Sequence, residues 1–185
     1  MIELVTYNVH GCKGLDWCVQ SDRPLEVLKR LDADCIALQE FVDTPLGDGR
    51  GLLDDWAAQL GMSAVYAPAF ERGQEIFGNA LLTRLPILER RDHDFSIGGY
   101  RRRMFPEVVL QADGATMQVL VVHFGVSPVE RARQSAQLAA VAAARDADLH
   151  VCAGDLNEPW RNGAASRTLA KLFRVGPPLA TVPPP

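Results

Sequence analysis

The stretch from residue 119 to residue 154 constrains the fold more than any other part of the chain. It begins with the continuous apolar run VLVVHF (119–124), continues through an alanine-rich segment and ends with a second apolar run, LHVCAG (149–154). Alanine favours helix, and Ser127-Pro128-Val129-Glu130 has the spacing of a capping box with proline at the first helical position. The sequence therefore predicts a helix that runs to about Arg145. One helix between two strands favours parallel strands in one sheet.

A β-hairpin is predicted directly before this unit. Asp113-Gly114 separates two β-rich runs, EVVLQA and ATMQVLVVHF, which is the pattern of a tight turn. The run CIALQ (35–39) is continuously apolar, as is typical of a strand covered on both faces. Further strands are expected at 2–9, 63–69, 78–84 and 86–95, and further helices at 24–31 (capped by Asp22), 51–61 and 166–173. The end of the chain, VGPPLATVPPP, is expected to be extended or loop-like.

These elements predict an α/β fold in which helices cover the outer faces of a mixed sheet or sheets. The chain has 185 residues, 48% of them hydrophobic, and no repeat or linker divides it, so we expect a single domain. A net charge of −4 excludes a broad basic field that gathers nucleic acid, although Arg101, Arg102 and Arg103 form a local cluster. We see no signal peptide and no membrane span, and we expect a cytoplasmic location.

Four apolar strands share an unusual feature, because each is followed by polar groups that can bind a metal ion or transfer a proton. Each such residue alone has a structural explanation, as a turn former, a helix cap or a solvated strand end. Four similar endings in one chain are harder to explain separately, and ligands often bind at sheet ends in α/β folds. The residues concerned are Asn8 with the neighbouring His10, Glu40 after Gln39, His123, and Asp155 with Asn157.

This set of residue types matches divalent-metal phosphoryl hydrolysis. Mg²⁺ prefers oxygen ligands and keeps several waters, so one or two protein carboxylates suffice. The ion neutralises phosphate charge and stabilises the departing oxygen. Asp155 and Asn157 are candidates to orient and deprotonate an attacking water, and His123 is a candidate to hydrogen-bond phosphoryl oxygens or donate a proton.

The motifs TYNVHG, ALQE, GNALLTRLPI, VVHFG and AGDLNEP, in this order, resemble the endonuclease/exonuclease/phosphatase superfamily. That metal-dependent group contains DNase I-like nucleases, inositol polyphosphate phosphatases and neutral sphingomyelinases. The resemblance extends from residue 2 to about residue 175, and GDLN is its most specific part. It implies a DNase I-like sandwich of two packed mixed β-sheets with helices on the outer faces, formed by residues 1–185 as one domain.

The resemblance also implies roles for individual residues. Glu40 matches the principal ligand of Mg²⁺ or Mn²⁺, and Asn8 lies near both the metal and the substrate phosphate. Arg103 matches an arginine that faces substrate phosphate, with Arg101 or Arg102 as alternatives, and Asn79 either lines the pocket or is structural. The catalytic residues that it implies are His123, Asp155 and Asn157. His10 is expected to be peripheral, and His93 and His150 receive no function.

The resemblance is incomplete at the C-terminal end. Members of the superfamily usually close with a strand that carries an aspartate and then a Ser-Asp-His-like motif, whereas no histidine follows His150 here and the last acidic residue is Glu158. We therefore expect that the chain is C-terminally truncated and lacks those strands, which leaves an unpaired sheet edge.

The expected function is hydrolysis of phosphoester bonds by water attack at phosphorus, with a divalent metal ion, as a phosphodiesterase, nuclease or phosphatase. The substrate is a nucleic acid, a phospholipid head group or a small phosphorylated molecule, and no obligate protein partner is expected. The alternative is a non-catalytic or truncated remnant that binds phosphorylated partners. The fold alone does not decide between these substrates.

Overall fold

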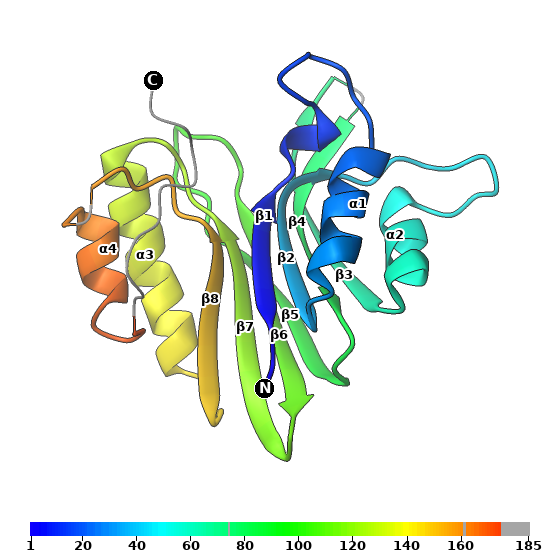
Figure 1. Ribbon diagram of the computed structural model, residues 1–185. Helices are drawn as coiled ribbons and strands as arrows, with labels where there is room; N and C mark the ends of the chain where they lie inside the picture. The colour runs from blue at the N-terminus through cyan, green and yellow to red at the C-terminus, as the bar shows by residue number, and fades with distance from the viewer. Residues whose placement is uncertain (74, 161, 175–185) are drawn as a thin grey trace.

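The computed structural model describes residues 1–73, 75–160 and 162–174, and it shows two four-stranded mixed sheets packed face to face (Figure 1). The first sheet has the order β1-β2-β4-β3 and the second has the order β5-β6-β7-β8. The predicted sandwich of two mixed sheets is therefore confirmed. The strands are β1 (Leu4–Asn8), β2 (Cys35–Val42), β3 (Ser63–Arg72), β4 (Glu75–Thr83), β5 (Ile87–Asp94), β6 (Met104–Ala112), β7 (Ala115–His123) and β8 (Leu149–Asp155).

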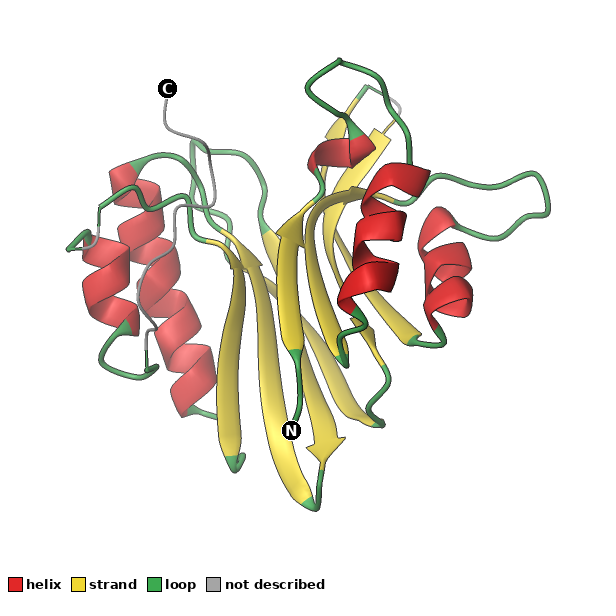
Figure 2. Cartoon of the chain, in the orientation of Figure 1, coloured by secondary structure: helices red, strands yellow, loops and turns green. Residues whose placement is uncertain are grey.

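Helices cover both outer faces of this sandwich (Figure 2). The first sheet is covered by α1 (Asp22–Leu31) and α2 (Leu52–Leu60), and the second by α3 (Pro128–Ala143) and α4 (Ala164–Leu169). A short 3₁₀ helix, η1 (His10–Cys12), follows β1. None of the described helices has both the length and the apolar character needed to cross a membrane.

Alternation along the buried strands produces three apolar layers. On β2, Ile36 and Leu38 face α1 and α2, whereas Cys35 and Ala37 face the second sheet. Side chains alternate in the same way on β7: Val119 and Val121 lie between the sheets, whereas Leu120 and Val122 face α3 and α4. A strand with apolar cover on both faces must be apolar at every position, which is why CIALQ and VLVVHF are continuous apolar runs.

The two connections predicted around β7 are confirmed. Strands β6 and β7 form an antiparallel hairpin in which Ala112 pairs with Ala115. The turn residues Asp113 and Gly114 have positive φ values of 48° and 87°, as a tight hairpin turn requires. Strands β7 and β8 are parallel, with α3 as the crossover between them, and His123 pairs in register with Asp155.

Several predicted helix details are wrong. Ser127 makes no side-chain cap to α3, because its hydroxyl donates to Tyr100 Oη at 3.1 Å, and Glu130 is buried against Gln134 (Oε1···Nε2 3.3 Å) instead of closing a capping box. Asp22 begins α1 as its first residue and does not cap it. Helix α4 spans 164–169 in place of the predicted 166–173, whereas α3 ends at Ala143, within two residues of its predicted end near Arg145. The predicted proline-rich tail, 175–185, lies outside the described residues.

The strands that carry Asn8 and Asp155 are edge strands among the residues described. Strand β1 pairs with β2 and strand β8 pairs with β7. Although they belong to different sheets, β1 and β8 contact each other across the sandwich (Figure 1). That further C-terminal strands complete these edges stays a prediction.

Gly154 is the position where β8 tolerates no larger residue. Its φ of +147° is rare for other residues, and a Cβ there would lie 1.9 Å from the Val122 carbonyl oxygen on β7. We predict that Gly154→Ala lowers the free energy of unfolding by about 3 kcal/mol, because backbone must move to relieve the overlap. Urea unfolding of both proteins measures this, with Gly98→Ala as the control, since nothing lies within 4 Å of the added methyl there. Equal stability of Gly154→Ala and wild type would contradict the close approach of β7 and β8.

Candidate functional site

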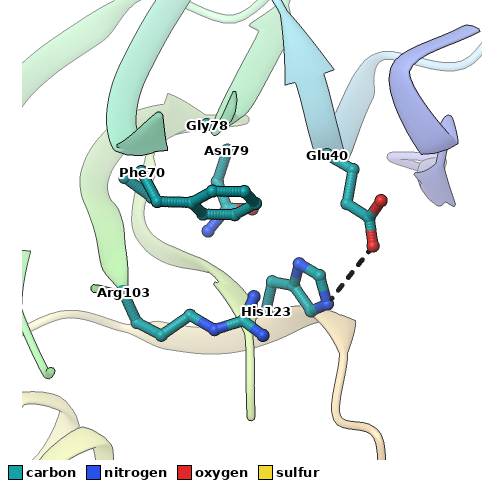
Figure 3. Close-up of a pocket in the computed structure, with 7 residues that line it drawn as sticks. Glu40, Phe70, Gly78, Asn79, Arg103 and His123 are labelled. Atoms are coloured by element: carbon teal, nitrogen blue, oxygen red, sulfur yellow. Dashed lines mark ion pairs between the residues drawn. The ribbon is translucent and has the colours of Figure 1, made fainter. Parts of the chain in front are cut away.

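The predicted polar residues meet at one end of the sandwich. Four of them, Glu40, Asn79, Arg103 and His123, line a single hollow together with Ala69, Phe70 and Gly78 (Figure 3). Asn8 and Asp155 adjoin this hollow through hydrogen bonds and close contacts to Glu40 and His123. Residues from both sheets therefore contribute to one site.

Asn8 joins the two sheets at this site. Its Nδ2 donates to Glu40 Oε1 at 3.3 Å and to Asp155 Oδ2 at 3.0 Å. Its Oδ1 accepts a hydrogen bond from the backbone N–H of His10 at 3.0 Å. One amide group thereby holds two carboxylates, from β2 and β8, near each other at the end of β1.

A β-bulge points Glu40 into the site. Leu38 pairs with Ala80 and Phe41 pairs with Gly78, so two residues of β2 face the single residue Asn79 of β4. Glu40 has a positive φ of 53°, and β2 continues past it to Val42. The expectation that β2 ends at Glu40 is therefore wrong, and the local bend of the bulge is what directs the carboxylate.

His123 lies near both carboxylates, and the predicted crossover between β7 and β8 brings it beside Asp155. Its Nε2 is 3.9 Å from Asp155 Oδ2 and 3.7 Å from Glu40 Oε1. Burial of the imidazole, reinforced by the nearby Arg103 guanidinium, lowers the pKa of His123 to about 4, although both carboxylates oppose this shift. The ring is therefore neutral at pH 7 and carries one N–H that can donate to a substrate oxygen.

Asn157 shapes the turn that follows β8. Its backbone N–H donates to Asp155 Oδ1 at 2.9 Å, and its Nδ2 donates to the Phe124 carbonyl at 2.8 Å. A positive φ of 47° at Asn157 allows both contacts. Since Oδ1 of Asp155 is engaged in this turn, Oδ2 is the oxygen that faces Asn8 and His123.

Of the three consecutive arginines, the structure places Arg103 in the hollow. Arg103 is only 7% exposed, and its Nε has no hydrogen-bond partner within the described part of the chain. Arg101 stacks on the Phe70 ring at 4.4 Å, and Arg102 is exposed with its Nε 3.8 Å from Asp94. Burial lowers the pKa of Arg103, yet the guanidinium stays charged, so the hollow contains a cation with unused hydrogen-bonding capacity.

Asn79 combines the two roles that the sequence left open. It lines the hollow, and its Nδ2 donates to the Met104 carbonyl of the opposite sheet at 2.8 Å.

Two residues at or beside the hollow were not predicted to contribute to the site. Phe70 gave no signal in the sequence, whereas His10, expected to be peripheral, places Nδ1 3.1 Å from Glu40 Oε2. Its position two residues after Asn8 was the available signal.

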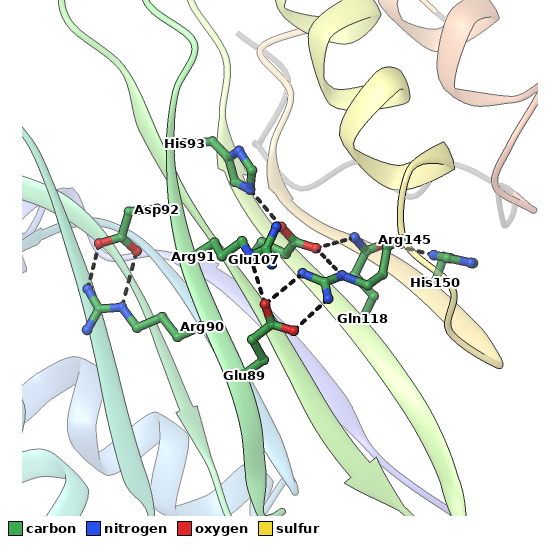
Figure 4. A network of polar contacts seen from close by, with 9 residues as sticks. All are labelled: Glu89, Arg90, Arg91, Asp92, His93, Glu107, Gln118, Arg145 and His150. Atoms are coloured by element: carbon green, nitrogen blue, oxygen red, sulfur yellow. Dashed lines mark hydrogen bonds and ion pairs between the residues drawn. The ribbon is translucent and has the colours of Figure 1, made fainter.

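The remaining histidines belong to a separate polar network on the second sheet (Figure 4). Glu107 is buried there and accepts from Gln118 at 2.7 Å and Arg145 at 2.8 Å, and its other oxygen lies 2.7 Å from His93 Nε2. Gln118 in turn contacts His150 Nδ1 at 2.7 Å. Because each of these buried groups has a partner, the network fits a structural role.

Comparison with known proteins decides the family. The sequence pattern of the "Endonuclease/Exonuclease/phosphatase family" matches residues 5–184. The chain belongs to this family. A curated relative, the "Uncharacterized protein YbhP" of Escherichia coli K12, is 34% identical over 90 residues, which cover 47% of this chain and 35% of that protein.

Solved structures share the family fold. An endonuclease/exonuclease/phosphatase from Beutenbergia cavernae superimposes with a TM-score of 0.69 and 22% identity, covering 87% of this chain and 48% of that one. A family protein from Leptotrichia buccalis gives a TM-score of 0.72 and 15% identity, covering 92% and 72%. ANGEL2, described as a 2',3'-cyclic phosphatase, gives 0.65 and 19%, covering 85% and 53%. The chain thus spans about half the length of two of these structures.

The donor atoms around this hollow fit a hydrated divalent ion. Within the described residues, no three His, Cys, Asp or Glu side chains form a closed metal cage. Glu40 nevertheless offers carboxylate oxygens beside Asp155, and Mg²⁺ needs only one or two carboxylates because it keeps several waters. Asn8 presents its amide nitrogen to Glu40. It therefore orients the carboxylate here, and direct ligation by Asn8 would require its oxygen.

We expect the buried Arg103 guanidinium to lower the stability of the fold while it serves phosphate binding. We predict that Arg103→Met raises the free energy of unfolding by about 1 kcal/mol, because a thioether of similar length removes the cost of burying the charge. The same change should abolish binding of inorganic phosphate. Urea unfolding and phosphate calorimetry measure the two effects, and Arg102→Met, at an exposed position, should alter neither. A loss of stability in Arg103→Met would show that the guanidinium stabilises the fold.

Proposed function

We propose that the chain hydrolyses phosphoester bonds with the help of a divalent metal ion. The observation that carries the proposal is the convergence of Glu40, Asp155, neutral His123 and buried Arg103 around one hollow. Carboxylates that would hold a metal ion, beside a guanidinium whose Nε has no hydrogen-bond partner among the described residues, suit the binding of a phosphate group.

The position of each residue in the hollow determines its proposed role. Glu40 would hold the ion, which when bound would neutralise phosphate charge and stabilise the departing oxygen. Arg103 donates to a non-bridging phosphoryl oxygen from its Nε–H, which has no partner among the described residues. Neutral His123 donates its N–H to the phosphoryl group as negative charge develops in the transition state.

Asp155 and Asn157 prepare the nucleophile. Asp155 Oδ2 accepts the proton of an attacking water, while the Asn157 backbone N–H fixes the other oxygen of the carboxylate at 2.9 Å. The water oxygen forms a bond to phosphorus as the bond to the leaving oxygen breaks. Asn8 keeps Asp155 and Glu40 at a fixed separation during this step.

The substrate is a phosphoester of a nucleic acid, a phospholipid head group or a small molecule. The printed description of ANGEL2 as a 2',3'-cyclic phosphatase supports phosphoester chemistry in this fold, at 19% identity. Four free cysteines in the described residues suit the reducing cytoplasm that we propose as the location. A binding role without catalysis uses the same Arg103 and His123, so only turnover separates the two functions.

The first test of this proposal is Glu40→Gln. We expect hydrolysis of plasmid DNA, RNA, bis-p-nitrophenyl phosphate or a phospholipid to require Mg²⁺ or Mn²⁺ and to stop in EDTA. Glu40→Gln should abolish this turnover and weaken Mg²⁺ binding by about tenfold or more, since the neutral amide is a poorer ligand. Glu26→Gln, on the exposed face of α1, is the control. Unchanged Mg²⁺ affinity by calorimetry would remove Glu40 from the metal site, and phosphate binding without turnover of any substrate would favour the non-catalytic role.

The second test concerns His123. We predict that His123→Ala lowers kcat about a hundredfold while KM changes little, because the ring donates mainly to charge that develops in the transition state. Steady-state kinetics on whichever phosphodiester is turned over measure both constants. A rise in KM at constant kcat would instead make His123 a ground-state binding residue.

A further inference from the structure

His10 occupies a position that the proposed mechanism does not use. It begins η1 with a positive φ of 51°, an uncommon conformation for a residue other than glycine. Two hydrogen bonds hold its backbone there: its N–H donates to the Asn8 side-chain Oδ1 at 3.0 Å, and its carbonyl accepts from the Lys13 N–H at 3.1 Å. The strained backbone brings the imidazole to the outer side of Glu40.

The separation of the two side chains has the size expected for neighbouring ligands of one ion. His10 Nδ1 lies 3.1 Å from Glu40 Oε2. An imidazole nitrogen and a carboxylate oxygen at this distance could hold the same ion.

The surroundings of His10 leave the other ring nitrogen available. The side chain is 69% exposed, and no described residue accepts a hydrogen bond from Nε2. A neutral ring can thus carry its proton on Nε2, toward water, and direct the Nδ1 lone pair at the ion. Asn8 reinforces this arrangement, because it engages Glu40 Oε1 and leaves Oε2 facing His10.

We propose that His10 is a metal ligand through Nδ1, and that it makes the site select a first-row transition ion over Mg²⁺. Imidazole nitrogen is a softer donor than carboxylate or water, so it adds more affinity for transition ions than for Mg²⁺, which prefers oxygen. This inference rests on the proposed metal-dependent function and deepens it by naming the class of ion. A simple hydrogen bond between His10 and Glu40 is the competing explanation of the 3.1 Å contact.

The experiment measures metal binding directly, apart from any hydrolysis. Calorimetry with Mn²⁺ and with Mg²⁺ is run on wild type, His10→Ala and His10→Asp, with His150→Ala as the control. His150 is matched because its Nδ1 also makes one side-chain contact, to Gln118 at 2.7 Å, but outside the site. Pulsed electron paramagnetic resonance of bound Mn²⁺ then detects coupling to an imidazole nitrogen.

We expect His10→Ala to lose about tenfold in Mn²⁺ affinity and less than about threefold in Mg²⁺ affinity. The ¹⁴N coupling should be present in wild type and His150→Ala and absent in His10→Ala. His10→Asp should bind Mg²⁺ at least as tightly as wild type, since it supplies an oxygen ligand, without recovering the preference for Mn²⁺.

Two results would overturn the inference. Equal losses of Mn²⁺ and Mg²⁺ affinity in His10→Ala would show that His10 acts only by positioning Glu40. Persistence of the ¹⁴N coupling in His10→Ala would assign the nitrogen ligand to another histidine. Failure of the proposed function has a different signature, since wild type would then bind Mn²⁺ with ¹⁴N coupling and hydrolyse no phosphoester.

Discussion

The amide of Asn8 is the interaction on which the site depends. It donates to Glu40 at 3.3 Å and to Asp155 at 3.0 Å, and these residues belong to different sheets. Two carboxylates side by side repel each other, and a shared donor offsets part of that repulsion. Because Asn8 ends β1 and contacts both partners, the site exists only when the two sheets are packed in one register.

The sandwich supplies that register. The layer between the sheets is apolar from Ala37 and Leu81 on one side to Val119 and Val121 on the other, so sliding either sheet would cost buried contacts. The close approach of Gly154 to Val122 fixes β8 against β7 and thus Asp155 beside His123. Packing energy far from the site thereby sets distances within it. The polar network around Glu107 further stabilises the second sheet, because it joins β6 to His93 on β5 and to Arg145 after α3.

The sequence revealed the features that depend on local pattern. Continuous apolar runs indicated the doubly covered strands β2 and β7, and Asp113-Gly114 indicated the hairpin. Polar residues at the ends of apolar strands predicted that Asn8, His123 and Asp155 lie together, and the ends of β1, β7 and β8 do meet in space. The resemblance to the endonuclease/exonuclease/phosphatase family then pointed to the same residues and implied their roles.

Features that depend on tertiary contacts were not predictable in this way. The bulge at Glu40 arises from pairing between β2 and β4, which no periodicity reports. Ser127 does not cap α3 because its hydroxyl donates to Tyr100, which is distant in sequence. Glu130 is buried beside Gln134 and therefore does not complete a capping box. The contact of His10 with Glu40 depends on a positive φ in η1, which the sequence pattern does not report.

A crystal structure grown with Mn²⁺ and inorganic phosphate tests the central claim most directly. The account predicts an anomalous scattering peak bonded to a Glu40 oxygen at about 2.1 Å. It also predicts a phosphate that bridges this ion to the Arg103 guanidinium, within hydrogen-bonding distance of His123. Mn²⁺ and phosphate bound elsewhere, with Glu40 and Arg103 contacting neither, would contradict the assignment of this hollow as a metal-dependent phosphoester site.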